Sequence, residues 1–381
     1  MTKDLIRAFV LLVLLFLGDL FFHFSDIPSL KIYDAISSLK ERIVRPPKAI
    51  DDIVLVGIDS ETIEHMKEKW PYSRATFAKA IHNLKKARPR AIGLDFNFFG
   101  ESTKEEDALL RNEIVNDNKV VLGALLTKTG GVQLSTMADL KNMHVHGIVN
   151  KFQDSDGTTR GALTYLINTN PNIPRFQVFS WELRLLDRAG YIDLGSLEDR
   201  GDRLVIQKGS DPKRGQTPFT IPVDPITKTF LIHFQAHSKD FKRLSFWQVA
   251  NGGFDSKLIE NKIVLVGFLS EMFQDLHHTP IGWLPGLTLN ANVLLTLYTQ
   301  NFIRSVPKIF DLALLILGVL LSTLWVLKAS FKKSLPWLLL ETAAFFGLSF
   351  LLLLGGFLWN YTLLPVGIIL IPVAVERLRK F

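Results

Sequence analysis

Short apolar segments bounded by polar residues recur through the middle of the chain. They cover residues 53–58, 91–96 and 262–268, and valine, isoleucine and leucine dominate them. The first and the last share the sequence Ile-Val-Leu-Val-Gly, at residues 53–57 and 263–267. Continuous apolar runs of this length are typical of strands in a parallel sheet that helices cover on both faces.

Helical patterns alternate with these strands. Residues 74–87 repeat apolar side chains at helical spacing after Ser73, a favourable N-cap, and Pro89 follows the end of the pattern. Residues 105–116 predict the next helix, and residues 120–126 the next strand. This β-α-β-α-β order, with right-handed crossovers, predicts a Rossmann-like parallel unit.

The remaining elements of this region are shorter or less regular. Residues 27–44 have helical spacing and end at Arg45-Pro-Pro47, which predicts a helix that precedes the sheet. Further on we expect strands at 204–207, 219–222 and 229–234, helices at 176–188 and 287–299, and a helical turn at 245–251.

A turn signal, Asp154-Ser-Asp-Gly157, separates extended patterns at 145–152 and 159–168. Asp-Gly between extended runs predicts a hairpin, and Arg160 is placed to pair with Asp154 or Asp156. A calcium loop is the alternative interpretation. It is disfavoured because position 165, where an EF-hand places its bidentate Glu, is Tyr.

Four long apolar stretches lie at the two ends of the chain, at residues 5–24, 308–327, 335–354 and 359–375. A bilayer core needs about 20 such residues. The first stretch lacks a small-x-small cleavage site, so we interpret it as an uncleaved signal anchor. Lysines in the link 328–334 and basic residues at the C-terminus predict that both termini are cytoplasmic and that residues 25–306 lie outside.

Three residues in or near these stretches add detail. Trp359 and Tyr361 suit an interfacial aromatic belt. Glu341 lies inside an apolar stretch, where a carboxylate is either functional or paired with a nearby lysine such as Lys332 or Lys333.

Together these patterns divide the chain into four segments. They are a signal anchor at 1–24, a juxtamembrane helix or linker at 25–50, a domain at 51–306, and three transmembrane helices with a short tail at 307–381. The expected fold class is an extracytoplasmic α/β domain, with a mostly parallel sheet and added antiparallel hairpins, plus four transmembrane helices.

Composition removes several classes of function. Hydrophobic residues make up 48% of the chain, and the excess is concentrated at its ends. The net charge of +7 is spread along the sequence and flanks the apolar stretches, so no nucleic-acid partner is expected. There is no cysteine, which excludes disulfides, zinc–cysteine sites and thiol nucleophiles. Dinucleotide, phosphate-loop and serine-hydrolase motifs are also missing, and we expect neither a cofactor nor an enzyme.

The best candidates for a shared polar site follow the predicted strands. Asp59 and Asp95 end the first two strands, and Asp275 follows the strand at 262–268. Ligands of parallel sheets collect at the carboxyl ends of strands. Arg74, at a helix start, and Trp70 complete a tentative ligand pocket, in which Arg74 would hold an anion or carboxylate. The alternative is a structural ion-pair cluster. Metal binding is not expected at Asp59 and Asp95, nor at His277-His278, whose side chains should point apart.

The ordered set of motifs resembles the CHASE2 family of extracytoplasmic sensory domains in bacterial membrane receptors. The matching pieces are Gly57-Ile-Asp59, Trp70-Pro-Tyr-Ser-Arg74, Ile92-Gly-Leu-Asp95, Asp107, Asp154-Ser-Asp-Gly157 with Arg160, Ile263-Val-Leu-Val-Gly267, Asp275, Pro285-Gly286 and Asn290-Ala-Asn292. The resemblance implies one N-terminal span, the domain and three further spans in the bacterial inner membrane. Such receptors usually continue into a cytoplasmic output module, but this sequence carries no kinase or cyclase motif.

Two functions are therefore expected from the sequence. In the first, the periplasmic domain senses a ligand or protein and signals through a separate cytoplasmic or membrane partner. In the second, the protein is a scaffold whose domain mediates oligomerisation or docking in the envelope. A homo-oligomer in the lipid bilayer suits either function.

Overall fold

The chain divides into two compact units, one formed by Arg45–Phe302 and the other by Met1–Val44 with Ile303–Phe381. The computed structural model describes residues 2–22, 26–115, 118–127, 131–137, 144–167, 177–207, 218–306, 308–358 and 363–379. The predicted belt residues Trp359 and Tyr361 lie outside these ranges.

A seven-stranded sheet forms the centre of the first unit, in the order β13-β1-β14-β2-β3-β4, with β5 also paired to β3. The strands are β1 (Ile53–Ile58), β2 (Ala91–Leu94), β3 (Val120–Leu126), β4 (Val132–Gln133), β5 (His146–Ile148), β13 (Lys242–Ser245) and β14 (Ile263–Phe268). Every pairing is parallel except that of β3 with β4. The predicted mostly parallel sheet is confirmed.

The two strands with the shared sequence are direct neighbours. β1 and β14 pair in register, with Ile53 opposite Ile263 and Gly57 opposite Gly267. β14 pairs with β2 on its other side, so β1 and β2 are not adjacent. The Rossmann-like β-α-β-α-β interpretation is wrong in this respect, because a strand from the far end of the domain takes the place between its first two strands.

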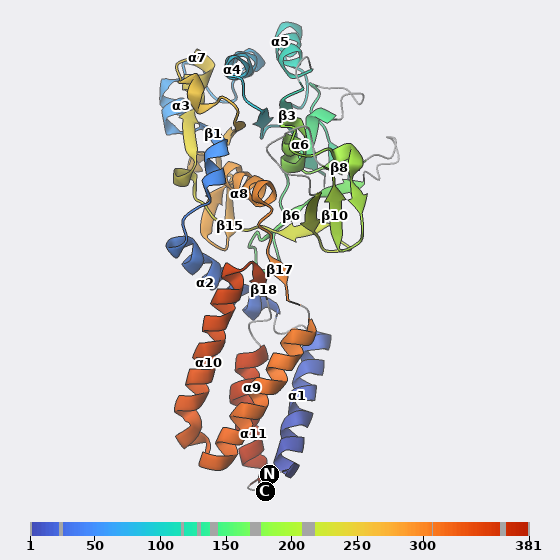
Figure 1. Cartoon of the computed structure of the whole chain (residues 1–381). Helices are drawn as coiled ribbons and strands as arrows, with labels where there is room; N and C mark the ends of the chain where they lie inside the picture. Colours follow the sequence, from blue (N-terminus) through green and yellow to red (C-terminus); the bar gives the residue numbers. More distant parts are fainter. Residues whose placement is uncertain are drawn as a thin grey trace. The chain divides into compact units, whose positions relative to one another are not determined.

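Helices cover both faces of this sheet, as predicted (Figure 1). Side chains alternate along each strand, so Val54 and Val56 face one hydrophobic cluster while Ile53 and Leu55 face the other. The first cluster includes α4 (Arg74–Lys86), α5 (Lys104–Val115) and α7 (Phe246–Asn251), and the second includes α6 (Trp181–Arg188) and α8 (Gly286–Thr299). The short helix α3 (Ser60–His65) follows β1.

Antiparallel pairings form small sheets separate from the main sheet. They are β6 (Gly161–Leu163) with β12 (Thr229–Leu231), β7 (Tyr165–Ile167) with β8 (Gln177–Phe179), β10 (Arg203–Ile206) with β9 (Glu198–Asp199) and β11 (Phe219–Pro222), and β15 (Leu276–Thr279) with β16 (Gly282–Pro285). The expected antiparallel additions to the sheet are thereby confirmed.

Two local predictions need correction. The helix expected from residue 176 begins at Trp181, because β8 occupies 177–179 and Ser180 caps the helix. The hairpin expected around residues 154–157 is reduced to one antiparallel bridge, between Phe152 and Gly161. Its two arms pair elsewhere, since β5 joins β3 and β6 joins β12.

The second unit is helical. It contains α1 (Thr2–Phe22), α2 (Asp26–Ile43), α9 (Lys308–Ala329), α10 (Phe331–Leu354) and α11 (Leu363–Arg379), with β17 (Arg304–Ser305) paired to β18 (Phe357–Leu358). α9 packs against α1, α10 and α11. The predicted juxtamembrane helix corresponds to α2, whose Lys40 Nζ donates a 2.9 Å hydrogen bond to the carbonyl of Leu353 in α10.

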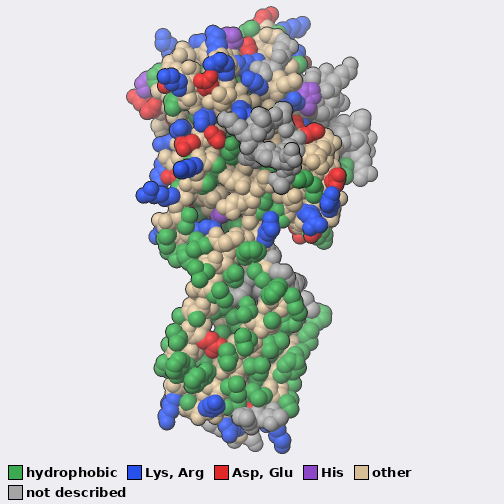
Figure 2. All heavy atoms as spheres, in the orientation of Figure 1, with side chains coloured by type: hydrophobic (Ala, Val, Ile, Leu, Met, Phe, Trp, Pro, Cys, Tyr) green, Lys and Arg blue, Asp and Glu red, His purple; other side chains and the backbone are tan. Residues whose placement is uncertain are grey.

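Length and composition identify two candidate membrane spans in the described chain, Leu312–Ala329 and Phe331–Leu354, rather than the four predicted. Figure 2 shows hydrophobic side chains crowding the visible surface of this unit. Exposed leucines of α9 and α10 include Leu317, Leu321, Leu339, Leu340 and Leu351. α11 has 17 residues, which corresponds to about 25 Å of helix against a bilayer core of about 30 Å.

The link predicted at 328–334 is also shorter than expected. α9 ends at Ala329 and α10 begins at Phe331, so Ser330 alone separates them, with φ +69°. Within the described chain Glu341 forms no ion pair with Lys332 or Lys333, and its Oε1 is buried without a hydrogen-bond partner.

Candidate functional site

A cavity of about 570 Å³ opens beyond the carboxyl ends of β2 and β14, beside the first turns of α8. Its lining is mixed polar and aromatic. The lining residues are Asp95, Phe96, Asn97, Leu125, Val149, Asn150, Lys151, Phe268, Phe273, Gln274, Asp275, His277, Gly286, Leu289 and Asn290. This is the position at which open parallel sheets hold their ligands, and the volume suits a small molecule.

Asp95 is held at the end of β2 by contacts from two neighbouring elements. Its N–H donates to the carbonyl of Val266 in β14 at 2.8 Å, and Asn290 Nδ2 of α8 donates to its Oδ2 at 2.8 Å. Burial raises the pKa of Asp95 to about 7, and the negative charge of Asp275 acts in the same direction. This carboxyl group therefore changes charge near neutral pH.

Asp275 lies at the start of the β15–β16 hairpin, against the N-terminus of α8. The N–H of Gly286 donates to the carbonyl of Asp275 at 2.9 Å. A Cβ at position 286 would come within 2.3 Å of Asp275 Oδ2, so only glycine leaves room for this carboxylate. His277 Nε2 lies 3.2 Å from Asp275 Oδ1.

Lys151 of the cavity wall belongs to a buried ion pair. Lys151 Nζ lies 2.9 Å from Glu182 Oε1, and the two side chains are 2% and 0% exposed. Lys151 also donates to the carbonyl of Val149 at 2.9 Å. The positive charge nearest the cavity is thus already compensated by a carboxylate of α6.

Aromatic rings form the apolar side of the cavity. Phe268 and Phe273 stack with centroids 4.2 Å apart, and Phe96 meets Phe268 edge-on at 5.3 Å. Trp70 packs behind them, 4.9 Å from Phe268 and 5.6 Å from Phe273. Trp70, predicted as a ligand contact, does not line the cavity itself but supports the residues that do.

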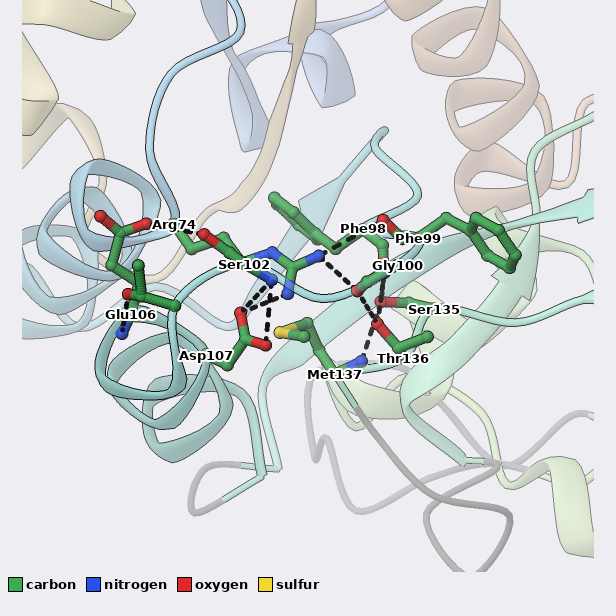
Figure 3. A network of polar contacts seen from close by, with 11 residues as sticks. Arg74, Phe98, Phe99, Gly100, Ser102, Glu106, Asp107, Ser135, Thr136 and Met137 are labelled. Atoms are coloured by element: carbon green, nitrogen blue, oxygen red, sulfur yellow. Dashed lines mark hydrogen bonds and ion pairs between the residues drawn. The ribbon is translucent and has the colours of Figure 1, made fainter.

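Arg74 belongs to a separate network, shown in Figure 3. Its guanidinium pairs with Asp107 of α5 and donates to the carbonyl of Gly100 at 2.7 Å. Burial alone would raise the pKa of Asp107, but hydrogen bonds from Arg74 and from the Ser102 N–H lower it below its usual value. The network anchors the far end of the loop that begins at Asp95, and neither Arg74 nor Gly100 lines the cavity.

Asp59 is a helix cap. It accepts hydrogen bonds from the N–H and hydroxyl of Thr62, at 2.9 and 2.8 Å, and from Ser245 Oγ at 2.6 Å. Ser245 is in turn the N-cap of α7, so Asp59 ties the starts of α3 and α7 together. Its hydrogen-bonding capacity is largely used within the fold.

The turn at residues 154–157 is organised by a buried arginine. Arg160, with a side chain 1% exposed, donates to Asp154 Oδ2 at 2.7 Å and to Asp156 Oδ2 at 2.8 Å. Gly157 has φ +77°, a conformation that favours glycine. No group of three or more residues able to hold a metal ion occurs in the described ranges.

The shared polar site predicted from sequence is therefore divided. Asp95 and Asp275 line one cavity, whereas Asp59 and Arg74 lie in other networks. The physical reason is β14, which separates the ends of β1 and β2 by two strand spacings, about 10 Å. Nothing in the sequence predicted Lys151 as a site residue. Asn290 appeared there only as part of a motif that resembles the CHASE2 family.

The fold and the cavity together define an α/β domain with a small-molecule-sized polar site, on a chain that also carries candidate membrane spans. The family model for the CHASE2 domain matches residues 8–325, so the chain belongs to the CHASE2 family, as the motifs indicated. This is a family of extracytoplasmic sensory domains. Comparisons with curated proteins and with solved structures gave no match.

Proposed function

We propose that this protein is a receptor-like membrane protein whose α/β unit binds a small molecule outside the cytoplasm and signals through a separate partner. The observation that carries the proposal is the cavity of about 570 Å³ with Asp95, Asp275 and Asn290 at its polar end. Membership of a sensory family supports it. The proposal assigns no catalytic step to these residues.

The proposed location is a bacterial inner membrane, with α1 and α11 completing a bundle of four spans around α9 and α10. Exposed basic residues support cytoplasmic termini. They lie at the end of α9, at the start of α10 and at the end of α11, and lysine and arginine favour the cytoplasmic side of a membrane. They are Lys328, Lys332, Lys333, Arg377 and Arg379. The α/β unit, Arg45–Phe302, is then placed on the extracytoplasmic side.

A hydrogen-exchange experiment tests the receptor proposal. The full-length protein in lipid nanodiscs is compared with and without a concentrated, protein-free metabolite extract. We expect slower amide exchange around residues 95–100 and 270–277, where a ligand in the cavity would contact the protein. We also expect a changed exchange rate in α9–α11, because a receptor has to transmit ligand binding to its membrane unit. Leu125→Trp, which places a larger side chain at the cavity wall, should abolish the response.

Leu109→Trp is the matched control, since Leu109 is 55% exposed on α5 and does not line the cavity. It should respond as the wild type does. Identical exchange in wild type and Leu125→Trp would reject the receptor function. If exchange were unchanged by the extract but varied with protein concentration, the scaffold function, with an oligomer as its basis, would be favoured instead.

A further inference from the structure

We propose that the ligand of this cavity is a small organic amine, bound as a cation between Asp95 and Asp275 and against the aromatic rings. This inference deepens the receptor function proposed above and rests on it. It specifies the chemical class of the ligand, which neither the fold nor the family defines.

The charges at the cavity are the first argument. Lys151 is neutralised by Glu182 at 2.9 Å, so this pair adds no net charge. Within the described chain, no lysine or arginine forms an ion pair with Asp95 or Asp275, although both face the cavity. The Asp275 side chain is 35% exposed and has His277 Nε2 at 3.2 Å, whereas Asp95 forms no ion pair in the described ranges. A bound cation would therefore balance the acidic charge of the cavity, chiefly that of Asp95, because a buried charge without a partner is costly.

The available hydrogen-bond acceptors are the second argument. Asn97 lines the cavity and donates through Nδ2 to the carbonyl of Gln133 at 3.0 Å, while its Oδ1 is buried without a partner in the described ranges. The carboxylate oxygens of Asp95 and Asp275 are acceptors that an ammonium group in the cavity can satisfy, and Asn97 adds an unpaired oxygen within the cavity wall. Phe268 and Phe273 offer ring faces or edges of the kind that pack against amine cations.

The size and ligand set argue against a bare metal ion. The cavity has a volume of about 570 Å³, which corresponds to a small organic molecule rather than to an ion. Among the described residues, Asp95, Asp275 and His277 do not form a group able to hold a metal. The acidic end of the cavity suits an ammonium group, and its aromatic side suits the carbon chain of an aliphatic amine.

Binding of such a cation should strengthen as the pH rises from 6 to 8. Burial and the charge of Asp275 raise the pKa of Asp95 to about 7, so this carboxyl group is mostly protonated at pH 6 and mostly ionised at pH 8. The amine remains protonated throughout, because its pKa is near that of lysine, about 10.4. The other charged or titratable groups that face Asp95 are Asp275, His277 and the Lys151–Glu182 pair.

Isothermal titration calorimetry on the full-length protein in detergent micelles tests the proposal. The probes are 1,4-diaminobutane, the uncharged 1,4-butanediol and the anionic succinate, which have four-carbon chains in common. We expect the diamine to bind measurably and with an affinity about tenfold or more above that of the diol, and we expect no measurable binding of succinate. Asp95→Asn and Asp275→Asn should each weaken diamine binding by about tenfold or more, and Asp95→Asn should remove most of its pH dependence.

Asp202→Asn is the matched control, because Asp202 is exposed and outside the cavity, and it should bind like the wild type. Thermal unfolding of each variant establishes that it is folded. Equal binding of diamine by all three variants, preference for the diol or succinate, or no binding of the diamine would each overturn the amine assignment. In that case the hydrogen-exchange experiment still tests the receptor function separately. A response to the metabolite extract that occurs in the wild type and is lost in Leu125→Trp would show that the receptor function holds although the ligand is not an amine.

Discussion

At the scale of single residues, the carboxylates of this protein differ in role because they differ in partners. Asp59 is saturated by Thr62 and Ser245, and Asp107 is paired with Arg74. Among the described residues, Asn290 donates a side-chain hydrogen bond to Asp95, which also lies near the carboxylate of Asp275. Asp95 lines the cavity and Asp59 does not, which is why Asp95 is the better candidate for contact with a ligand.

The buried arginine of the 154–157 turn gives a test of stability. Arg160→Met should lower the free energy of unfolding by about 3–5 kcal/mol, because it removes the buried ion pair with the carboxylate of Asp156. Urea unfolding of the full-length protein, followed by tryptophan fluorescence, measures the loss.

Arg200→Met is the control for this prediction. Arg200 and Glu198 form a pair whose side chains are about half exposed, so its removal should cost less than about 1 kcal/mol. Equal losses for the two variants would contradict the structural role assigned to Arg160.

The residues of the candidate site were partly accessible from the sequence. Asp95 and Asp275 follow apolar strands and also belong to the motifs that resemble the CHASE2 family, and these two signals marked them. Lys151 and Glu182 could not be paired from sequence, because they are 31 positions apart on a loop and a helix that only the packed fold brings together (182 − 151). Asp59 caps a helix, and from sequence this role could not be separated from a ligand contact, because both have the same pattern after a strand.

At the scale of elements, apolar runs were predicted well and polar strands were missed. β1 and β3 have the bounds that the sequence indicates, and α8 differs by one residue at its start. β13, with the sequence Lys-Arg-Leu-Ser, and β15, with Leu-His-His-Thr, have no apolar periodicity. They are strands because neighbouring strands supply hydrogen-bond partners, which is information that a local pattern does not contain.

The contact between β5 and α6 gives the second test. A Cβ at Gly147 would lie 2.4 Å from the Cα of Trp181, so the strand and the helix backbone touch at this point. Gly147→Ala should destabilise the protein by about 2–3 kcal/mol, because backbone atoms cannot move aside as the end of a side chain can. The same urea experiment measures it.

Gly253→Ala is the appropriate comparison. The nearest atom to a Cβ there is a carbonyl oxygen at 3.9 Å, an ordinary contact, so the change should be smaller than about 1 kcal/mol. If Gly147→Ala were as mild as this control, the close approach of β5 and α6 would be wrong.

At the scale of the whole molecule, the absence of cysteine makes the membrane topology directly testable. Single cysteines at Lys333 and Phe357 would report on the two ends of α10, where both side chains are exposed. We expect a membrane-impermeant maleimide to label Phe357→Cys in intact cells with permeabilised outer membranes. Lys333→Cys should be labelled only after the inner membrane is opened, because basic flanks favour the cytoplasmic side.

The wild-type chain, which has no thiol, sets the background of this measurement. Labelling of both positions from one side would reject α10 as a span. Ser334, inside the link expected from the sequence, is a poor reporter, because it is fully buried within α10 and donates to the carbonyl of Trp325 at 3.0 Å.

The position of β14 between β1 and β2 has a consequence for how the protein is made. The chain emerges in order, so β1 and β2 are present long before Ile263–Phe268, the strand that joins them. Until then each exposes an unpaired backbone edge, which is a template for pairing with other chains. Folding of the domain is thus delayed until most of it has been synthesised, and nascent chains shorter than about 270 residues should need holding chaperones and remain protease-sensitive.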